Sequence, residues 1–248
     1  MKSLRNLVIL QARMSSRRLP GKVLMPLNGE PMIYRQIARI LESQEVENLI
    51  VATSTDPSDD ELVDYLNMKG VASFRGSLDN VFSRFYEIIN CESPDTIIRL
   101  TADCPLVMPN IIDAMLSQFY IRETEYMSNA LHPTYPDGLD IEIFSRECFN
   151  RLSTLSLTQE ELEHVTLGIN NRKDVFKIEN YSDVDDNSKL RWTVDYLEDF
   201  EFIKAVYANF QGREKEFTYQ EVLNFVGLNP GIESKISWTR RNESLKRQ

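Results

Sequence analysis

Short apolar runs alternate with segments of helical periodicity along the first half of the sequence, and this alternation restricts the fold more than any other feature. The expected strands cover 7–12, 49–53, 71–74 and 96–100, and the expected helices cover 31–41, 59–68, 78–89 and 111–119. Strands joined through helices pair in parallel, because each crossover returns the chain to the same end of the sheet. The pattern predicts an α/β fold with a mostly parallel sheet and helices on both faces.

The rhythm changes after about residue 120. Two further strands are expected at 126–131 and 139–144, on either side of the turn-rich stretch HPTYPDG, and a helix is expected at 197–209. We therefore predict one domain over residues 1–248, with a small antiparallel insertion or dimerisation region at about 120–190. The polar, basic residues 234–248 are expected to form a mobile tail.

Composition narrows the class of protein. The formal net charge is -10, which argues against nucleic acid as a partner because phosphate neutralisation supplies most of that affinity. No apolar run approaches the length of a membrane span, and the run Leu7–Leu10 is too short for a signal peptide. The cysteines Cys91, Cys104 and Cys148 are too few and scattered for a disulfide framework. We expect a protein of a reduced compartment, in the cytoplasm, without a membrane partner.

A basic loop interrupts this acidic chain directly after the first expected strand. The stretch QARMSSRRLPGKVL places four cations within ten residues, together with two serines and a glycine; the cations are Arg13, Arg17, Arg18 and Lys22. Ligands in open α/β sheets bind beyond the carboxyl ends of the strands, so the composition suits a triphosphate. The spacing matches neither GxxxxGK[ST] nor GxGxxG. The alternative is a solvated cationic loop that serves solubility.

The same loop resembles the ARxxSxRLPGKxL signature of nucleotidyltransferases that activate acidic sugars with CTP. The likeness is greatest to the family of spore coat polysaccharide biosynthesis protein F, which is similar to the CMP-KDO and CMP-acylneuraminate synthetases. Five further stretches support it in the same order, namely FRGSLDNVFSRFYE, RLTADCPLV, PDGLDIEIFS, ELEHVT and LRWTVDYLEDFEFI. The resemblance implies a Rossmann-like nucleotide-diphosphosugar transferase fold and a homodimer.

The resemblance also assigns the nucleotide site. Arg13, Arg18 and Lys22 are expected to hold the triphosphate and to act in catalysis. The other expected nucleotide contacts come from the first loop, from strand ends and from FRGS, and they are Leu10, Ala12, Ser16, Thr53, Thr101 and Arg75. Main chain around 10–12 is expected to read the exocyclic amine of cytosine.

Two aspartates are expected to hold magnesium (Mg²⁺). Asp103 follows the strand 96–100 and Asp195 follows the apolar-flanked RWTV, so both would lie at strand ends on the same side of the sheet. Magnesium takes hard oxygen ligands, commonly one or two carboxylates with substrate phosphates and waters. Spacing alone is equally compatible with two helix caps, Asp103 before the helix after Pro105 and Asp195 before the helix near Leu197.

The acceptor sugar is expected to meet Asp140, Glu142 and His164. Strand alternation would place Asp140 and Glu142 on one face, and the resemblance implies that this face meets the sugar. The alternatives are solvent-facing carboxylates on an antiparallel strand and a structural histidine.

These expectations describe a sugar cytidylyltransferase. It would transfer CMP from CTP to an acidic or deoxy sugar, or to a sugar phosphate, with release of pyrophosphate. Two other functions stay open at this point. One is a glycosyltransferase that uses a nucleotide sugar, and the other is a noncatalytic nucleotide-binding module of the same fold.

Overall fold

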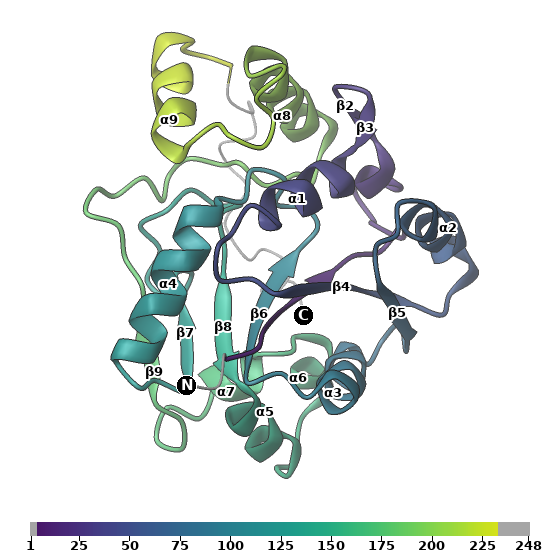
Figure 1. Cartoon of the computed structure of the whole chain (residues 1–248), viewed down its shortest axis with the longest axis vertical. Helices are drawn as coiled ribbons and strands as arrows, with labels where there is room; N and C mark the ends of the chain where they lie inside the picture. Colours follow the sequence, from purple (N-terminus) through teal and green to yellow (C-terminus); the bar gives the residue numbers. More distant parts are fainter. Residues whose placement is uncertain (1–3, 233–248) are drawn as a thin grey trace.

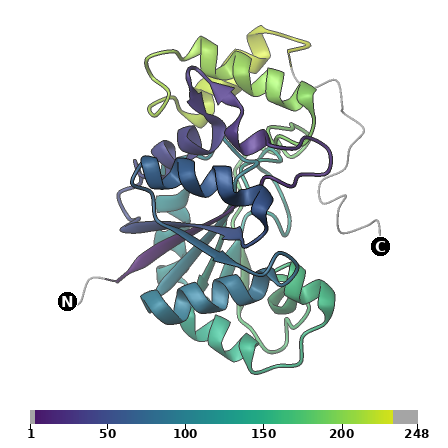
Figure 2. The same cartoon turned by 90° about the vertical axis from the view of Figure 1, so that its right-hand side faces the viewer.

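The computed structural model describes residues 4–232 and contains one large sheet between two layers of helices (Figures 1 and 2). The predicted tail at 234–248 lies outside the described residues. The strands of the large sheet are β1 (Asn6–Gln11), β4 (Asn48–Ser54), β5 (Ser73–Gly76), β6 (Thr96–Thr101), β7 (Tyr126–Ser128), β8 (Glu142–Ser145) and β9 (Ile178–Asn180). The helices of ten residues or more are α3 (Val81–Glu92), α4 (Pro109–Ile121), α8 (Leu197–Asn209) and α9 (Tyr219–Leu228). The shorter helices are α1 (Met32–Ile40), α2 (Asp60–Met68), α5 (Arg146–Ser153), α6 (Gln159–Glu163) and α7 (Leu167–Asn170).

The sheet is mostly parallel, as predicted. Its strand order is β5-β4-β1-β6-β8-β7-β9, and only β8 runs against its neighbours. A separate two-stranded antiparallel sheet joins β2 (Pro26–Leu27) and β3 (Glu30–Pro31) beside the start of α1. The carboxyl ends of β1, β4, β5 and β6 therefore meet at one edge of the large sheet, where a ligand site is expected.

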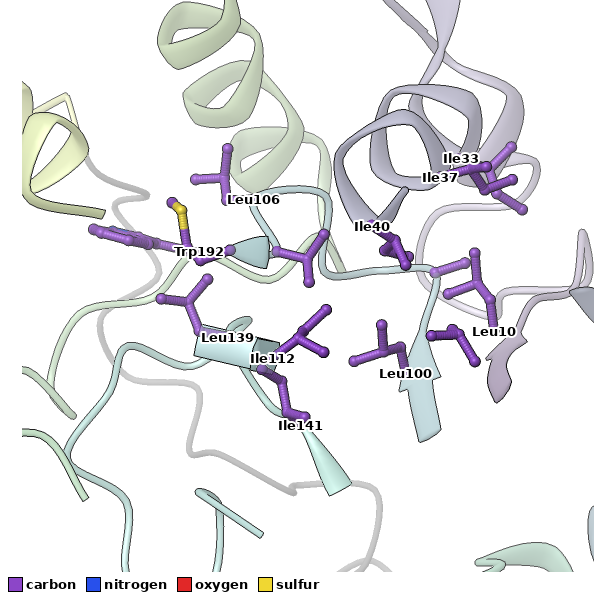
Figure 3. Packing of buried hydrophobic residues seen from close by; sticks show 14 of the residues in the cluster. Leu10, Ile33, Ile37, Ile40, Leu100, Leu106, Ile112, Leu139, Ile141 and Trp192 are labelled. Atoms are coloured by element: carbon purple, nitrogen blue, oxygen red, sulfur yellow. The ribbon is translucent and has the colours of Figure 1, made fainter. Parts of the chain in front are cut away.

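Alternate residues of β1 feed two separate hydrophobic cores. Val8 and Leu10 pack into a cluster with α1, α2, α4 and α8, whereas Leu7 and Ile9 pack against α3 and α5 on the other face. Figure 3 shows the first cluster, in which Leu10 and Leu100 of the sheet lie near Ile40 of α1. A continuous apolar run is thus explained by a strand that is buried on both faces.

The two strands predicted after residue 120 are shorter than expected. β7 ends at Ser128, and β8 begins only at Glu142. Asp140 therefore precedes the strand, and the prediction that it shares a strand face with Glu142 is wrong. The reason is that the side chain of Asn129, the residue after β7, binds the backbone on both sides of Asp140: it donates to Leu139 O and accepts from Ile141 N, each at 2.8 Å.

Candidate active site

The basic loop leaves β1 and is tied to the end of β4 by a buried carboxylate. Met14 N donates to Asp59 Oδ1 at 2.7 Å, while Asp59 Oδ2 accepts from Thr53 Oγ1 at 2.9 Å and from Ser54 N at 3.0 Å. Asp59 is completely buried, so these donors replace the water that its carboxylate has lost. The start of the loop is fixed to the neighbouring strand by the fold itself.

Within the loop, one carbonyl organises a compact turn. Met14 O accepts from Ser16 N and from Gly21 N, each at 2.9 Å, and Ser16 Oγ accepts from Leu19 N at 3.4 Å. Gly21 has a φ of 72°, in the left-handed region that glycine adopts without steric cost. The turn brings Lys22 into the interior of the molecule.

Lys22 joins the basic loop to both of the predicted metal ligands. The side chain is buried, and its Nζ donates to Val194 O at 2.5 Å. The same nitrogen lies 3.5 Å from Asp103 Oδ2 and 3.3 Å from Asp195 Oδ1. The two carboxylates therefore face one common point.

Asp103 follows β6 as predicted, but Asp195 does not follow a strand. The segment 190–195 is a loop with one isolated β-bridge, between Arg191 and Asp137, and Val194 N donates to Asp103 O at 2.8 Å. This bond fastens the Asp195 segment to the Asp103 loop. The two acids meet through loop contacts, so the strand-end prediction for Asp195 is wrong although the predicted proximity is present.

Neither aspartate caps a helix. The helix after Asp103 is α4, which begins only at Pro109 and has no side-chain cap. Asp199 Oδ2 accepts from Asp195 N and from Tyr196 N, each at 2.9 Å, so the start of α8 is capped by Asp199. Both carboxylates are left to face the cleft, which removes the capping alternative.

A second cation stabilises Asp195. Arg191 Nη2 donates to Asp195 Oδ2 at 2.9 Å, and its Nη1 donates to Asp137 Oδ2 at 2.8 Å. Arg18 Nη2 also lies 3.3 Å from Asp195 Oδ2, and its guanidinium stacks over the Tyr196 ring at 5.3 Å. Arg18 of the basic loop thus contacts the second predicted metal ligand directly.

These groups border a cavity of about 300 Å³. It lies at the carboxyl end of β6 and extends past the start of β8 to α7. Seven of the predicted site residues line it, namely Arg18, Thr101, Asp103, Asp140, Glu142, His164 and Asp195. The cavity therefore joins the predicted metal ligands to the predicted sugar contacts.

Asp103 is ionised in this setting. Burial alone would raise the pKa of its carboxyl, but the charge of Lys22 and a hydrogen bond from Thr101 hold that pKa below its usual range. The Thr101 hydroxyl lies at the end of β6 and lines the same cavity. Asp103 is therefore available as an anionic oxygen ligand at neutral pH.

Glu142 lies at the other end of the cavity in a buried polar network. It pairs with Arg99 and accepts from the hydroxyls of Tyr126 and Thr166. Burial opposes its ionisation, but Arg99 and these hydroxyls hold the pKa of Glu142 below its usual value. The alternative of a solvent-facing carboxylate is excluded for Glu142, because its side chain is only 12% exposed.

His164 lines the cavity at the end of α6. Burial is the main reason that its pKa is lowered from the usual value of 6.5, so the imidazole is neutral near pH 7. Asp140 also lines the cavity, on the loop that Asn129 fixes. The structure thus brings all three predicted sugar contacts to one cavity.

Other predicted nucleotide contacts lie away from this cavity. Leu10 is in the middle of β1 between two parallel neighbours, and Ala12 N donates to Ala52 O at 3.1 Å. Thr53 is buried and its hydroxyl donates to Asp59. Arg75 pairs with Asp60 at 2.7 Å and donates to Ser54 O and Asp56 O. The hydroxyl of Thr53 and the guanidinium of Arg75 therefore have structural partners near the end of β4. Arg13 and Ser16 are part of the basic loop and do not line this cavity.

Four residues of the site were not predicted from the sequence, namely Asp59, Arg99, Asn129 and Arg191. Only Arg191 left a signal, because it precedes Asp195 by four residues in RWTVD. The other three act through partners that are distant in sequence, such as Glu142 for Arg99, 43 residues away, and Met14 for Asp59, 45 residues away. Their roles depend on the tertiary fold.

The donor set fits an open magnesium site. Within residues 4–232, no three His, Cys, Asp or Glu side chains gather closely enough for a closed metal site. Asp103 and Asp195 nevertheless lie side by side, since both contact Lys22 Nζ, and magnesium commonly takes one or two carboxylates while substrate phosphates and waters complete its shell. Such a site is complete only when a phosphate ligand is present.

Comparison with known proteins gives relatives over almost the whole chain. Spore coat polysaccharide biosynthesis protein SpsF of Bacillus subtilis is 32% identical over 234 residues, which is 90% of this chain and 95% of that protein. A cytidylyltransferase structure from Leptospira borgpetersenii has a TM-score of 0.88 and 31% identity, covering 94% of this chain and 98% of that one. A CMP-2-keto-3-deoxy-manno-octonic acid synthetase in complex with CTP shares the fold, with a TM-score of 0.63 at 18% identity over 83% of this chain and 99% of that chain.

The matched region contains every element that builds the cavity. Residues 7–221 match the sequence profile of the cytidylyltransferases, so the match begins in β1 and ends in α9. It includes the basic loop, both facing aspartates and the loop before β8. The chain therefore belongs to the cytidylyltransferase family.

Proposed function

We propose that this protein transfers the cytidylyl group of CTP to a sugar acceptor and releases pyrophosphate, as a step in making precursors of surface glycans. The observation that carries the proposal is the position of Lys22, whose ammonium pairs with both Asp103 and Asp195, two carboxylates that line the same cavity. The cationic loop suits the negative charge of a triphosphate, and the two neighbouring carboxylates suit a metal cation. The family assignment does not favour the glycosyltransferase alternative.

Arg13, Arg18 and Lys22 are assigned to the triphosphate. Their charges would neutralise the phosphates and stabilise the pyrophosphate that leaves. Val194 O and two carboxylates already fix the Lys22 side chain, so little conformational entropy would be lost when it binds the triphosphate. The acceptor oxygen would attack the α-phosphorus, the bond to pyrophosphate would break, and the hydroxyl proton would pass to water.

Asp140, Glu142 and His164 are assigned to the acceptor. The cavity between them and Asp103 is about 300 Å³, which is at the lower end of the usual range for small-molecule sites. Asp140 and Glu142 offer carboxylate oxygens, and His164 offers a neutral imidazole, so the wall suits the hydroxyl groups of a sugar. An acidic or deoxy sugar, or a sugar phosphate, is proposed as the acceptor.

Magnesium (Mg²⁺) is proposed as the cofactor, with Asp103 and Asp195 as its protein ligands. Bound there, it would supply Lewis-acid stabilisation of phosphate charge. Lys22, Arg18 and Arg191 would keep the two carboxylates oriented, because each forms an ion pair with one or both of them.

The test is pyrophosphate release by the purified chain. CTP, UTP, GTP and ATP would each be incubated with magnesium and a panel of acidic and deoxy sugars and sugar phosphates. The proposal expects release with CTP and one acceptor, and no release when the acceptor is left out. Release of a free nucleoside diphosphate from a nucleotide sugar would instead indicate a glycosyltransferase.

Two further properties stay predictions. The homodimer and the cytoplasmic location follow from the family resemblance and the cysteine content, and size-exclusion chromatography with light scattering tests the first. Within the described residues, none of the helices has the length and apolar character to span a membrane.

A further inference from the structure

Helix α3 carries a buried arginine that has few hydrogen bonds. Arg84 is 1% exposed, and its Nε, which is fully shielded from solvent, has no hydrogen-bond partner in the part of the chain that the structure describes. Its Nη1 donates to Ala52 O over 3.4 Å, the long limit of a hydrogen bond. Among residues 4–232, no carboxylate lies within ion-pair distance of this guanidinium. A buried cation in this state is costly unless an acceptor completes it.

A second buried arginine, Arg39, has a structural role and serves as a comparison for Arg84. Arg39 is fully buried, and it donates to Val107 O at 2.9 Å and to Phe217 O at 3.0 Å. Its guanidinium also lies 3.7 Å from the centre of the Phe217 ring. Burial is the main cause that lowers the pKa of each arginine to about 10. Both side chains are buried, but within residues 4–232 the hydrogen bonds of Arg39 satisfy its guanidinium, whereas Arg84 Nε has no acceptor.

Arg84 lies directly beneath the basic loop. Ala52 O, which accepts from Arg84 Nη1, also accepts from Ala12 N at the start of that loop. The positive charge of Arg13 acts on Arg84 unfavourably, while the buried Asp59 acts on it favourably. Two cations thus approach each other at the carboxyl ends of β1 and β4, a position where an anionic or carbonyl oxygen would relieve both.

Gly76 explains how the side chain fits there. A Cβ at Gly76 would lie 2.6 Å from Arg84 Cγ and 3.3 Å from the Phe74 ring. The absence of a side chain at the end of β5 therefore leaves the space that Arg84 occupies. Gly76 and Arg84 both belong to the stretch FRGSLDNVFSRF, and neither has a role in the reaction proposed above.

We propose that Arg84 is a nucleotide-binding residue, whose guanidinium donates to an acceptor oxygen of the bound nucleoside triphosphate from beneath the basic loop. The inference rests on the proposed function, because it takes CTP as the ligand. A guanidinium has donors only, so its partner is an oxygen of the phosphates or the carbonyl oxygen of the pyrimidine.

Calorimetric titration of the full chain with CTP in the presence of magnesium tests the proposal. Arg84→Gln should raise the Kd for CTP about tenfold or more, because a hydrogen bond from a charged group is lost. Arg84→Lys keeps the charge but not the planar fork and should weaken binding less than Arg84→Gln. Gly76→Ala keeps the arginine and displaces it, so it too should raise the Kd.

Arg39→Gln is the matched control. It also removes a buried arginine and should lower the melting temperature. The Kd for CTP should stay at the wild-type value, since Arg39 belongs to α1 and donates to Val107 and Phe217 on the opposite face of the sheet from α3. A fold defect alone would therefore affect the control as much as the test variants.

Tripolyphosphate and cytidine locate the contact. A loss that also appears with tripolyphosphate assigns Arg84 to the phosphates, and a loss that appears with cytidine assigns it to the base. Wild-type protein that binds CTP while folded Arg84→Gln binds it equally well would overturn the inference and leave the proposed function standing. A wild-type chain that binds no CTP would overturn both.

Discussion

At the scale of single side chains, the site is a balance of charge around Lys22. The Lys22 ammonium contacts the carboxylates of Asp103 and Asp195, and Arg18 and Arg191 both contact Oδ2 of Asp195. Both carboxylates are therefore paired with cations before a ligand binds.

Removal of the Asp103 charge is the first prediction. Asp103→Asn should leave the fold intact and lower kcat by about 10²-fold, roughly 3 kcal/mol of activation free energy, because a metal ligand is lost. Steady-state pyrophosphate release at saturating magnesium measures the loss. Glu160→Gln, an exposed change outside the cavity, serves as the control. Near-normal turnover of Asp103→Asn would show that its carboxylate is not a metal ligand.

Asp59 positions the basic loop without reaching the ligand. In Asp59→Asn one acceptor oxygen becomes a donor that faces Met14 N, Ser54 N or Thr53 Oγ1. The loop should lose its anchor, and KM for CTP should rise about tenfold while kcat changes less. Separate determination of kcat and KM tests this. Asp60→Asn is the neighbouring control, and equal KM values for the two variants would count against a positioning role.

At the scale of elements, the hydrophobic periodicity of the sequence predicted the helices and the central strands correctly. The four expected parallel strands, now β1, β4, β5 and β6, and the helices between them were found within a few residues of the expected bounds. The helix at 197–209 was found at its predicted bounds. The basic loop and the Asp103 loop follow from those strands. The prediction was wrong where backbone bonds go to distant loops, as at Asp140 and Asp195, because the contacts of Asn129 and Val194 are not encoded in local periodicity.

Gly138 permits the loop before β8 to touch the Asp195 segment. Its φ is 111°, and a Cβ there would lie 2.4 Å from Thr193 N. Gly138→Ala should lower the free energy of unfolding by at least about 1 kcal/mol and should also reduce kcat/KM. Gly212→Ala also has a positive φ, but its Cβ would meet nothing within 4 Å. Urea unfolding of both variants separates backbone strain from the clash, and equal losses would contradict the role given to Gly138.

The start of α6 should respond to acid. Hydrogen bonds from Arg172 are the main reason that the pKa of Glu161 is lowered to about 2 from 4.5, and Glu161 also completes a capping box with Thr158. The folded-state pKa is depressed, so the stability contributed by Glu161 is full above pH 4.5 and is lost as pH falls toward 2.

Urea unfolding of wild type and Glu161→Gln from pH 7 to pH 3 measures that contribution. The difference between the two proteins should be largest at pH 7 and should shrink below pH 4.5. Glu160→Gln, on the same helix, should follow the wild type throughout. A difference that does not vary with pH would show that the ion pair with Arg172 is not its source.

At the scale of the whole molecule, the sheet gathers distant segments at one end. The carboxyl ends of β1 and β6 supply the basic loop and Asp103, while the chain between β9 and α8 returns across them with Asp195 (Figure 1). The region 120–190 adds β7, β8 and β9 to the same sheet and contributes Asp140, Glu142 and His164 to the cavity. One end of the sheet can therefore hold both substrates of a group transfer.

The most direct measurement of the central claim is an analysis of products by phosphorus NMR, with CTP, magnesium and the acceptor found in the panel. The account predicts equal amounts of pyrophosphate and a cytidylylated sugar, formed together and abolished in Asp103→Asn. Release of a nucleoside diphosphate, or consumption of CTP without a cytidylylated product, would contradict it.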